Sequence, residues 1–111
     1  MTPILNRPLV LETATRVPDG VGGFTLAWQP LGTLWAAVRP GTPRTLDQPG
    51  GGERSVPLRI TVRGAAPGAP SRPQPGQRFR DGARTYPIAQ VSEADPQGRH
   101  LLCLAFEAPA P

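Results

Sequence analysis

Residues 19–28 read DGVGGFTLAW, a glycine-rich turn that runs directly into an apolar and aromatic segment. In this segment Phe24, Leu26 and Trp28 alternate with smaller residues, which is the two-residue period of a β-strand with one apolar face. A second apolar segment, LWAAVRP at residues 34–40, follows shortly afterwards. The two segments together predict a β-rich fold built around tryptophan-bearing strands.

The break between these segments contains Pro30 and Gly32. Proline lacks a backbone donor and glycine weakens a strand, so regular pairing is interrupted there. We expect one long strand over residues 24–39, bent at the break, in preference to two strands with a tight connection. Residues 8–16 alternate apolar and polar side chains and predict a preceding strand, which residues 18–20 turn back.

The second half of the chain carries further strand signals. Residues 56–63 alternate between apolar and polar side chains and form the clearest two-faced strand of the sequence. Asp81-Gly82 predicts a hairpin turn, and Val91, which is out of phase in the strand that follows, indicates a β-bulge. Residues 99–107 have an unbroken apolar centre, which is typical of a strand buried on both faces.

Length and composition define the fold class. The 111 residues suit a single domain over residues 1–111, and the 16 Pro and 13 Gly argue against long helices. We predict an all-β fold, a small antiparallel β-barrel or compact sandwich of five to six strands with long Pro/Gly-rich loops at 40–54 and 64–76. The expected core is formed by Phe24, Trp28, Trp35, Val38, Ile60, Val62, Tyr86, Ile88, Leu102, Leu104 and Phe106.

All 12 basic residues are arginine, and the chain contains no lysine. Arginine is favoured at interfaces and phosphate contacts, whereas a GC-rich coding bias explains the same composition without any function. The formal net charge of +4 is compatible with nucleic acid nearby, since cationic surfaces attract polyanions without sequence preference.

Residues for catalysis or metal binding are scarce. His100 is the only histidine, and with the single Cys103 it falls short of the ligands that a zinc site needs. No nucleophile and base are spaced as a catalytic pair, so we expect no enzyme, no cofactor and no metal. The N-terminus lacks a secretory signal and no segment reaches the length of a transmembrane helix, which predicts synthesis in the cytoplasm and no membrane partner.

Several short motifs occur in a characteristic order. DGVGGFT at residues 19–25 is followed by WAAVRP at 35–40, PGQR at 75–78 and DGARTYPI at 81–88, and a final apolar strand completes the series. In order and spacing the chain resembles the head–tail joining proteins of tailed phages, also called head-closure or stopper proteins. The resemblance extends from about Leu9 to Phe106, and the arginine-rich composition also suits a phage-like gene transfer agent.

The resemblance implies a β-barrel subunit of a homo-oligomeric ring, a hexamer or dodecamer, that closes the DNA-filled head at the head–tail junction. The portal and its adaptor would lie on the head side, the tail terminator or tail tube on the tail side, and packaged DNA in the channel. The long loop would contact the channel or a neighbouring subunit through Arg39, Arg44, Leu46, Asp47 and Arg54. Candidate contacts between subunits or rings are Arg59, Arg63, Arg78, Arg80 and Arg84.

Two other readings stay open at this point. A free nucleic-acid-binding small barrel would use basic and aromatic residues on one face. A small hydrolase would require an active site that the sequence does not show.

Overall fold

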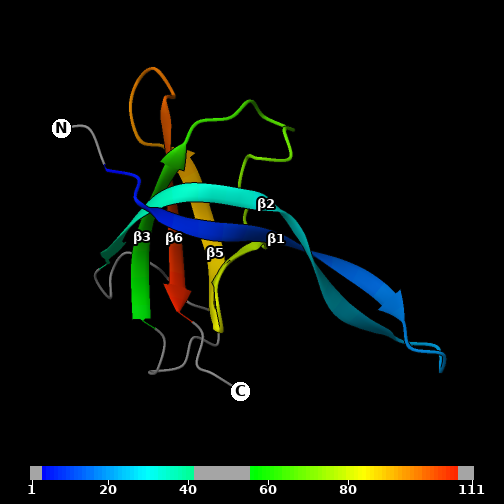
Figure 1. The fold of residues 1–111 in the computed structure, drawn as a ribbon. Helices are drawn as coiled ribbons and strands as arrows, with labels where there is room; N and C mark the ends of the chain where they lie inside the picture. The colour runs from blue at the N-terminus through cyan, green and yellow to red at the C-terminus, as the bar shows by residue number, and fades with distance from the viewer. Residues whose placement is uncertain (1–3, 42–55, 108–111) are drawn as a thin grey trace.

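The computed structural model describes residues 4–41 and 56–107, and these ranges contain strands and no helix (Figure 1). Six strands occur within them: β1 (Arg7–Pro18), β2 (Phe24–Pro40), β3 (Val56–Arg63), β4 (Arg78–Asp81), β5 (Arg84–Glu93) and β6 (His100–Glu107). All pairings are antiparallel, and the order β1-β2-β3-β6-β5-β4 closes on itself as a barrel. The predicted all-β class is confirmed.

Strand β2 is continuous through the Pro30 and Gly32 break, so the expectation of one long bent strand is confirmed. In the pairing with β1, Leu11 lies opposite Gly32 and Glu12 lies opposite Pro30, which leaves Leu31 as an extra residue in a β-bulge. Gly32 has a φ of 146°, a backbone conformation that side chains disfavour. The bulge changes the phase of β2 relative to a regular strand.

The outer half of the β1–β2 hairpin leaves the barrel. β4 pairs with β1 only over residues 10–12, and β3 pairs with β2 only over residues 36–40. Residues 13–29, which we call the arm, are therefore paired only within the hairpin among the described strands. Figure 1 shows the arm as a twisted two-stranded ribbon that extends away from the other strands, and the longest dimension of the molecule is 52 Å.

Inward-facing residues of all six described strands form the barrel core. Its fully enclosed members are Leu9, Leu11, Ala36, Ile60, Val62, Phe79, Tyr86, Leu101, Cys103 and Ala105, with Leu58 and Ile88 almost as well buried. Of the residues expected in the core, Ile60, Val62, Tyr86 and Ile88 are buried there. Val38 is half-buried and packs against them.

The expectation was wrong for Phe24 and Trp35, whose exposed fractions are 61% and 58%. Both side chains lie on the outer face of the β1–β2 ribbon, where the described part of the chain leaves them more than half exposed. Strand β6 is not buried on both faces either, because its odd-numbered residues point inward. Leu102, Leu104 and Phe106 face outward and are half-buried.

The remaining connections agree with the turn signals. Asp81 pairs with Arg84 across a two-residue turn in which Gly82 has a φ of 62°, as expected for a hairpin. The pairing of β5 with β6 shifts register between Ile88 and Gln90, so the predicted bulge is confirmed. Residues 64–77 connect β3 to β4 and bury Pro73. No helix long and apolar enough to cross a membrane occurs in the described ranges.

Candidate assembly surfaces

The arm has two chemically different faces. Cross-strand partners share a face, and the pairs Ala14–Trp28, Arg16–Leu26 and Pro18–Phe24 place the large apolar side chains together. The other face carries Thr13, Thr15, Val17, Thr25, Ala27 and Gln29. Leu26 is 64% exposed and Phe24 nearly as much, so the apolar face is open to solvent in the isolated chain.

The bulge at Leu31 extends this apolar face onto the barrel. Trp35 pairs with Pro8, and Trp28 pairs with Ala14, so both tryptophans lie on the side of β1 that carries its even-numbered residues. Without the extra residue their spacing of seven would place them on opposite faces. We call Phe24, Leu26, Trp28 and Trp35 the aromatic face.

Two arginines cover part of the aromatic face. The Arg16 guanidinium lies 5.8 Å from the centre of the Phe24 ring, and the Arg78 guanidinium lies 4.1 Å from the Trp28 ring. The second contact joins β4 to the base of the arm. The chain thus stacks guanidinium groups on aromatic rings, and Arg78 combines this contact with an ion pair to Glu12.

Glu12 anchors the base of the arm to the barrel. Its carboxylate accepts a hydrogen bond from Arg78 Nε at 2.7 Å and another from Arg80 Nε at 2.8 Å. The glutamate is 5% exposed. Burial acts to raise the pKa of Glu12, but the hydrogen bonds and charges of Arg80 and Arg78 offset it and hold the pKa below its usual value. The pair β1–β4 is thus joined by a charged cluster on its outer side.

The tip of the arm is a tight turn built around Asp19. The Asp19 carboxylate accepts hydrogen bonds from the backbone N–H groups of Val21 and Gly23, at 2.9 and 3.0 Å. These bonds lower the pKa of Asp19, and the positive φ of Gly20 and Gly22 explains the glycines of the turn. The DGVGG motif is therefore a structural turn.

A second surface lies on the outer side of β2, β3 and β6. Here a groove of about 460 Å³ is lined by Ala37, Arg39, Arg59, Thr61, Ala94, Asp95, Gln97, Arg99, His100 and Leu102. Arg39 and Arg59 are direct cross-strand partners, and two like charges in this position destabilise the strand pair. We call this the arginine groove.

Asp95 is the one carboxylate among the described residues that line the arginine groove, and it is already engaged. It accepts a hydrogen bond from the Arg99 backbone N–H at 2.8 Å and lies 3.3 Å from Nδ1 of His100. The backbone bond from Arg99 is the main cause of the lowered pKa of Asp95. Within the described residues no carboxylate forms an ion pair with Arg39 or Arg59.

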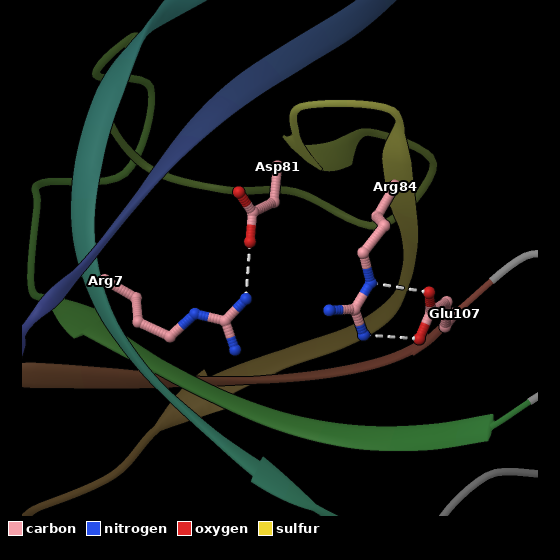
Figure 2. Close-up of polar contacts among 4 residues, drawn as sticks. All are labelled: Arg7, Asp81, Arg84 and Glu107. Atoms are coloured by element: carbon pink, nitrogen blue, oxygen red, sulfur yellow. Dashed lines mark hydrogen bonds and ion pairs between the residues drawn. The ribbon is translucent and has the colours of Figure 1, made fainter.

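Two ion pairs lie at one end of the barrel (Figure 2). Arg84 donates two hydrogen bonds to Glu107, at 2.7 and 2.8 Å, and Arg7 donates one to Asp81. The first pair joins the start of β5 to the end of β6, beyond the point where their backbone ladder stops at Ile88. The hydrogen bonds from Arg84 lower the pKa of Glu107. This end also holds the described boundaries of the long loop, at Gly41 and Val56.

The structure separates the arginines that the sequence singled out. Arg78, Arg80 and Arg84 form ion pairs with carboxylates of the same chain. Arg59 and Arg63 are exposed on the outer face of β3, and Arg39 is exposed near the end of β2. Four loop residues fall outside the described ranges, namely Arg44, Leu46, Asp47 and Arg54.

The sequence favours core packing of the two tryptophans over an aromatic binding platform, whereas in the structure Trp35 is exposed on the aromatic face. The alternation places Phe24, Leu26 and Trp28 on one face of a strand and predicts that Phe24 and Trp28 lie in the core. The opposite face carries Thr25, Ala27 and Gln29, which is the pattern of an ordinary half-buried strand, so the sequence holds no local signal that the apolar side is exposed.

Similarity to known proteins extends over almost the whole chain. The family model of the phage head completion protein matches residues 1–109. The chain is also similar to a chain in the solved virion of a native gene transfer agent particle, with 46% identity and a TM-score of 0.80 over 99% of this chain and 100% of that one. None of the curated proteins matches. The chain therefore belongs to the phage head completion protein family, and it is a structural virion protein, not an enzyme.

Proposed function

We propose that this chain is the subunit of a ring at the head–tail junction that closes the DNA-filled head and provides the docking surface for the tail. The observation that carries the proposal is the similarity, over almost the full length of both chains, to a component of an assembled gene transfer agent virion. Its particle is then a gene transfer agent or a related phage. The partners are the portal and adaptor on one side and the tail terminator or tail tube on the other.

The shape of the molecule supports this role. A closed ring needs two different surfaces on each subunit, one for each neighbour. The aromatic face and the arginine groove are two such surfaces, and they differ in chemistry. The closed barrel also leaves few strand edges for unspecific pairing.

We place the long loop, residues 40–54, toward the channel or a neighbouring subunit. It leaves the barrel beside Gly41, whose N–H donates to the carbonyl of Pro57 at 2.9 Å. The ion-paired end therefore carries the loop, and Arg39 stands where it leaves the barrel. Arg44, Leu46, Asp47 and Arg54 are the loop residues that we expect to contact DNA or the next subunit.

The test is complementation in vitro. Heads and tails are prepared from cells that lack this chain and are mixed with the purified chain. We expect joined particles and recovered transfer of DNA, in proportion to the chain added. Separate heads and tails at saturating chain would overturn the proposal.

A free nucleic-acid-binding barrel is the second candidate, and the arginine groove is the observation that favours it. That function predicts affinity for DNA that falls steeply with salt and is lost in Arg59→Glu. Affinity of this kind, together with intact tailed particles in the absence of the chain, would favour the second candidate over the ring.

A further inference from the structure

We infer that the arm of one subunit lies in the arginine groove of the next copy of the same chain, with its aromatic face against the guanidinium groups of Arg39 and Arg59. This inference rests on the proposed ring. It assigns the two sides of the subunit contact and states the chemistry that joins them.

The arm needs a partner. A two-stranded hairpin is at best marginally stable in water without a third layer. Yet Phe24, Leu26 and Trp35 are all more than half exposed, and they lie on one face together with Trp28. An exposed apolar face of this kind marks an interaction surface. In the described part of the chain the guanidinium groups of Arg16 and Arg78 lie over Phe24 and Trp28, and Leu26 and Trp35 stay more than half exposed.

The arginine groove needs a partner of the complementary kind. Arg39 and Arg59 lie side by side, and no described carboxylate pairs with either. Aromatic rings stabilise guanidinium groups by stacking, and the chain already uses this contact at Arg78 with Trp28 and at Arg16 with Phe24. Leu102 in the groove adds an apolar contact for Leu26.

The topology makes the contact one between copies. The groove is centred on β3 and β6, and β6 lies three places from β1 in the closed order. The arm extends away from these strands in Figure 1, so it does not reach the groove of its own chain. Contact between an arm and the groove of another copy is head-to-tail, which is the geometry that generates rings.

The experiment is cysteine cross-linking in assembled particles. Leu26→Cys places a thiol on the aromatic face, and Gln97→Cys places one at an exposed position of the groove. The native Cys103 is fully buried and does not compete. With a short bismaleimide, the double variant should give a ladder of cross-linked copies. Each single variant should give almost none, because neither position meets itself in a head-to-tail contact.

Thr25→Cys combined with Gln97→Cys is the matched control. Thr25 neighbours Leu26 but lies on the other face of the arm. We expect it to cross-link at least several-fold less. Equal ladders from both double variants, or no ladder from particles that contain the chain, would overturn the inference and leave the ring itself standing.

Two further outcomes of the cross-linking experiment would also overturn the inference. Attachment of Leu26→Cys to a different particle protein would mean that the arm binds that protein, and the inference would be wrong. Particles that carry none of this chain would overturn the proposed function together with the inference. As an independent check, Phe24→Ser should weaken self-association about tenfold, whereas Thr25→Ser on the opposite face should leave it unchanged.

Discussion

At the scale of single residues, Glu12 is the buried carboxylate of the described structure and holds two arginines at once. Replacing it by glutamine removes the charge that satisfies Arg78 and Arg80. We expect Glu12→Gln to lower the free energy of unfolding by about 1–3 kcal/mol at pH 7, measured by urea denaturation. Glu107→Gln, in the more exposed pair with Arg84, is the control and should have a smaller effect.

The same residue predicts a dependence on pH. The pKa of Glu12 is lower in the folded chain than in the unfolded chain, so its contribution is complete above the ordinary glutamate pKa. It is lost as the pH falls through the lower, folded value. Urea denaturation between pH 7 and pH 3 should therefore show a shallower loss of stability for Glu12→Gln than for the natural chain. Parallel curves would contradict this assignment.

Cys103 offers a probe of the core. Its side chain is fully enclosed, and burial raises the pKa of the thiol to about 12. The thiolate is the reactive form, so we expect no reaction with a disulfide reagent at pH 8 in the native chain. Full reaction should appear in denaturing urea. Rapid labelling under native conditions would show that β6 is not held in the barrel.

Residue patterns predicted part of the core correctly and part of it wrongly, for one reason. The alternation of β3 identified Ile60 and Val62, which the core of the closed barrel encloses. The same alternation in β2 placed Phe24 on an apolar face. Whether that face is buried depends on another part of the structure packing against it, which the local sequence does not specify. In β6, a run of apolar residues hides the alternation, so the inward phase of Leu101 and Cys103 was not visible.

At the scale of elements, the arm and the barrel should differ in local stability. Arm residues have one strand partner each, whereas β3 and β6 have neighbours on both sides. By hydrogen exchange, amides of residues 14–17 and 25–28 should exchange much faster than those of β3 in the isolated chain. Assembly into particles should slow the arm selectively. Equal protection in the free chain would contradict the description of the arm as a separate element.

The sequence predicted the elements better than their assembly. Pro30 and Gly32 indicated a bend in one long strand, and Val91 indicated a bulge, because both signals are local. Only the second half of β2 belongs to the barrel. This depends on where β3 pairs with β2 and where β4 pairs with β1, and both of these strands lie far along the chain. Such long-range registers leave little trace in a single sequence.

At the scale of the whole molecule, we expect that the arginines that promote assembly lower the stability of the single subunit. Arg39 and Arg59 repel each other in the isolated chain. Arg59→Thr should leave the free energy of unfolding unchanged or raise it by up to about 1 kcal/mol, while ring formation is lost. Urea denaturation and native mass spectrometry measure the two effects.

Arg63→Thr is the control for that variant, because Arg63 is exposed on the same strand but lies opposite His100 and outside the groove lining. It should affect neither quantity strongly. If Arg59→Thr unfolded the subunit as readily as it abolished assembly, Arg59 would be a structural residue and the groove would lose its role.

The family and the structural role follow from motifs spread over the whole chain, and the comparisons confirm them. The contacts of the proposed ring could not be predicted from the sequence in the same way, because they depend on surfaces that only the folded barrel defines. The arginine groove combines residues from strands that are distant in sequence, and the aromatic face depends on the bulged register between β1 and β2.

The most direct test of the central claim is electron microscopy of particles assembled with and without this chain. The account predicts that heads and tails both form in its absence but remain separate, and that the heads lose their DNA. Intact, DNA-filled, tailed particles without the chain would contradict it.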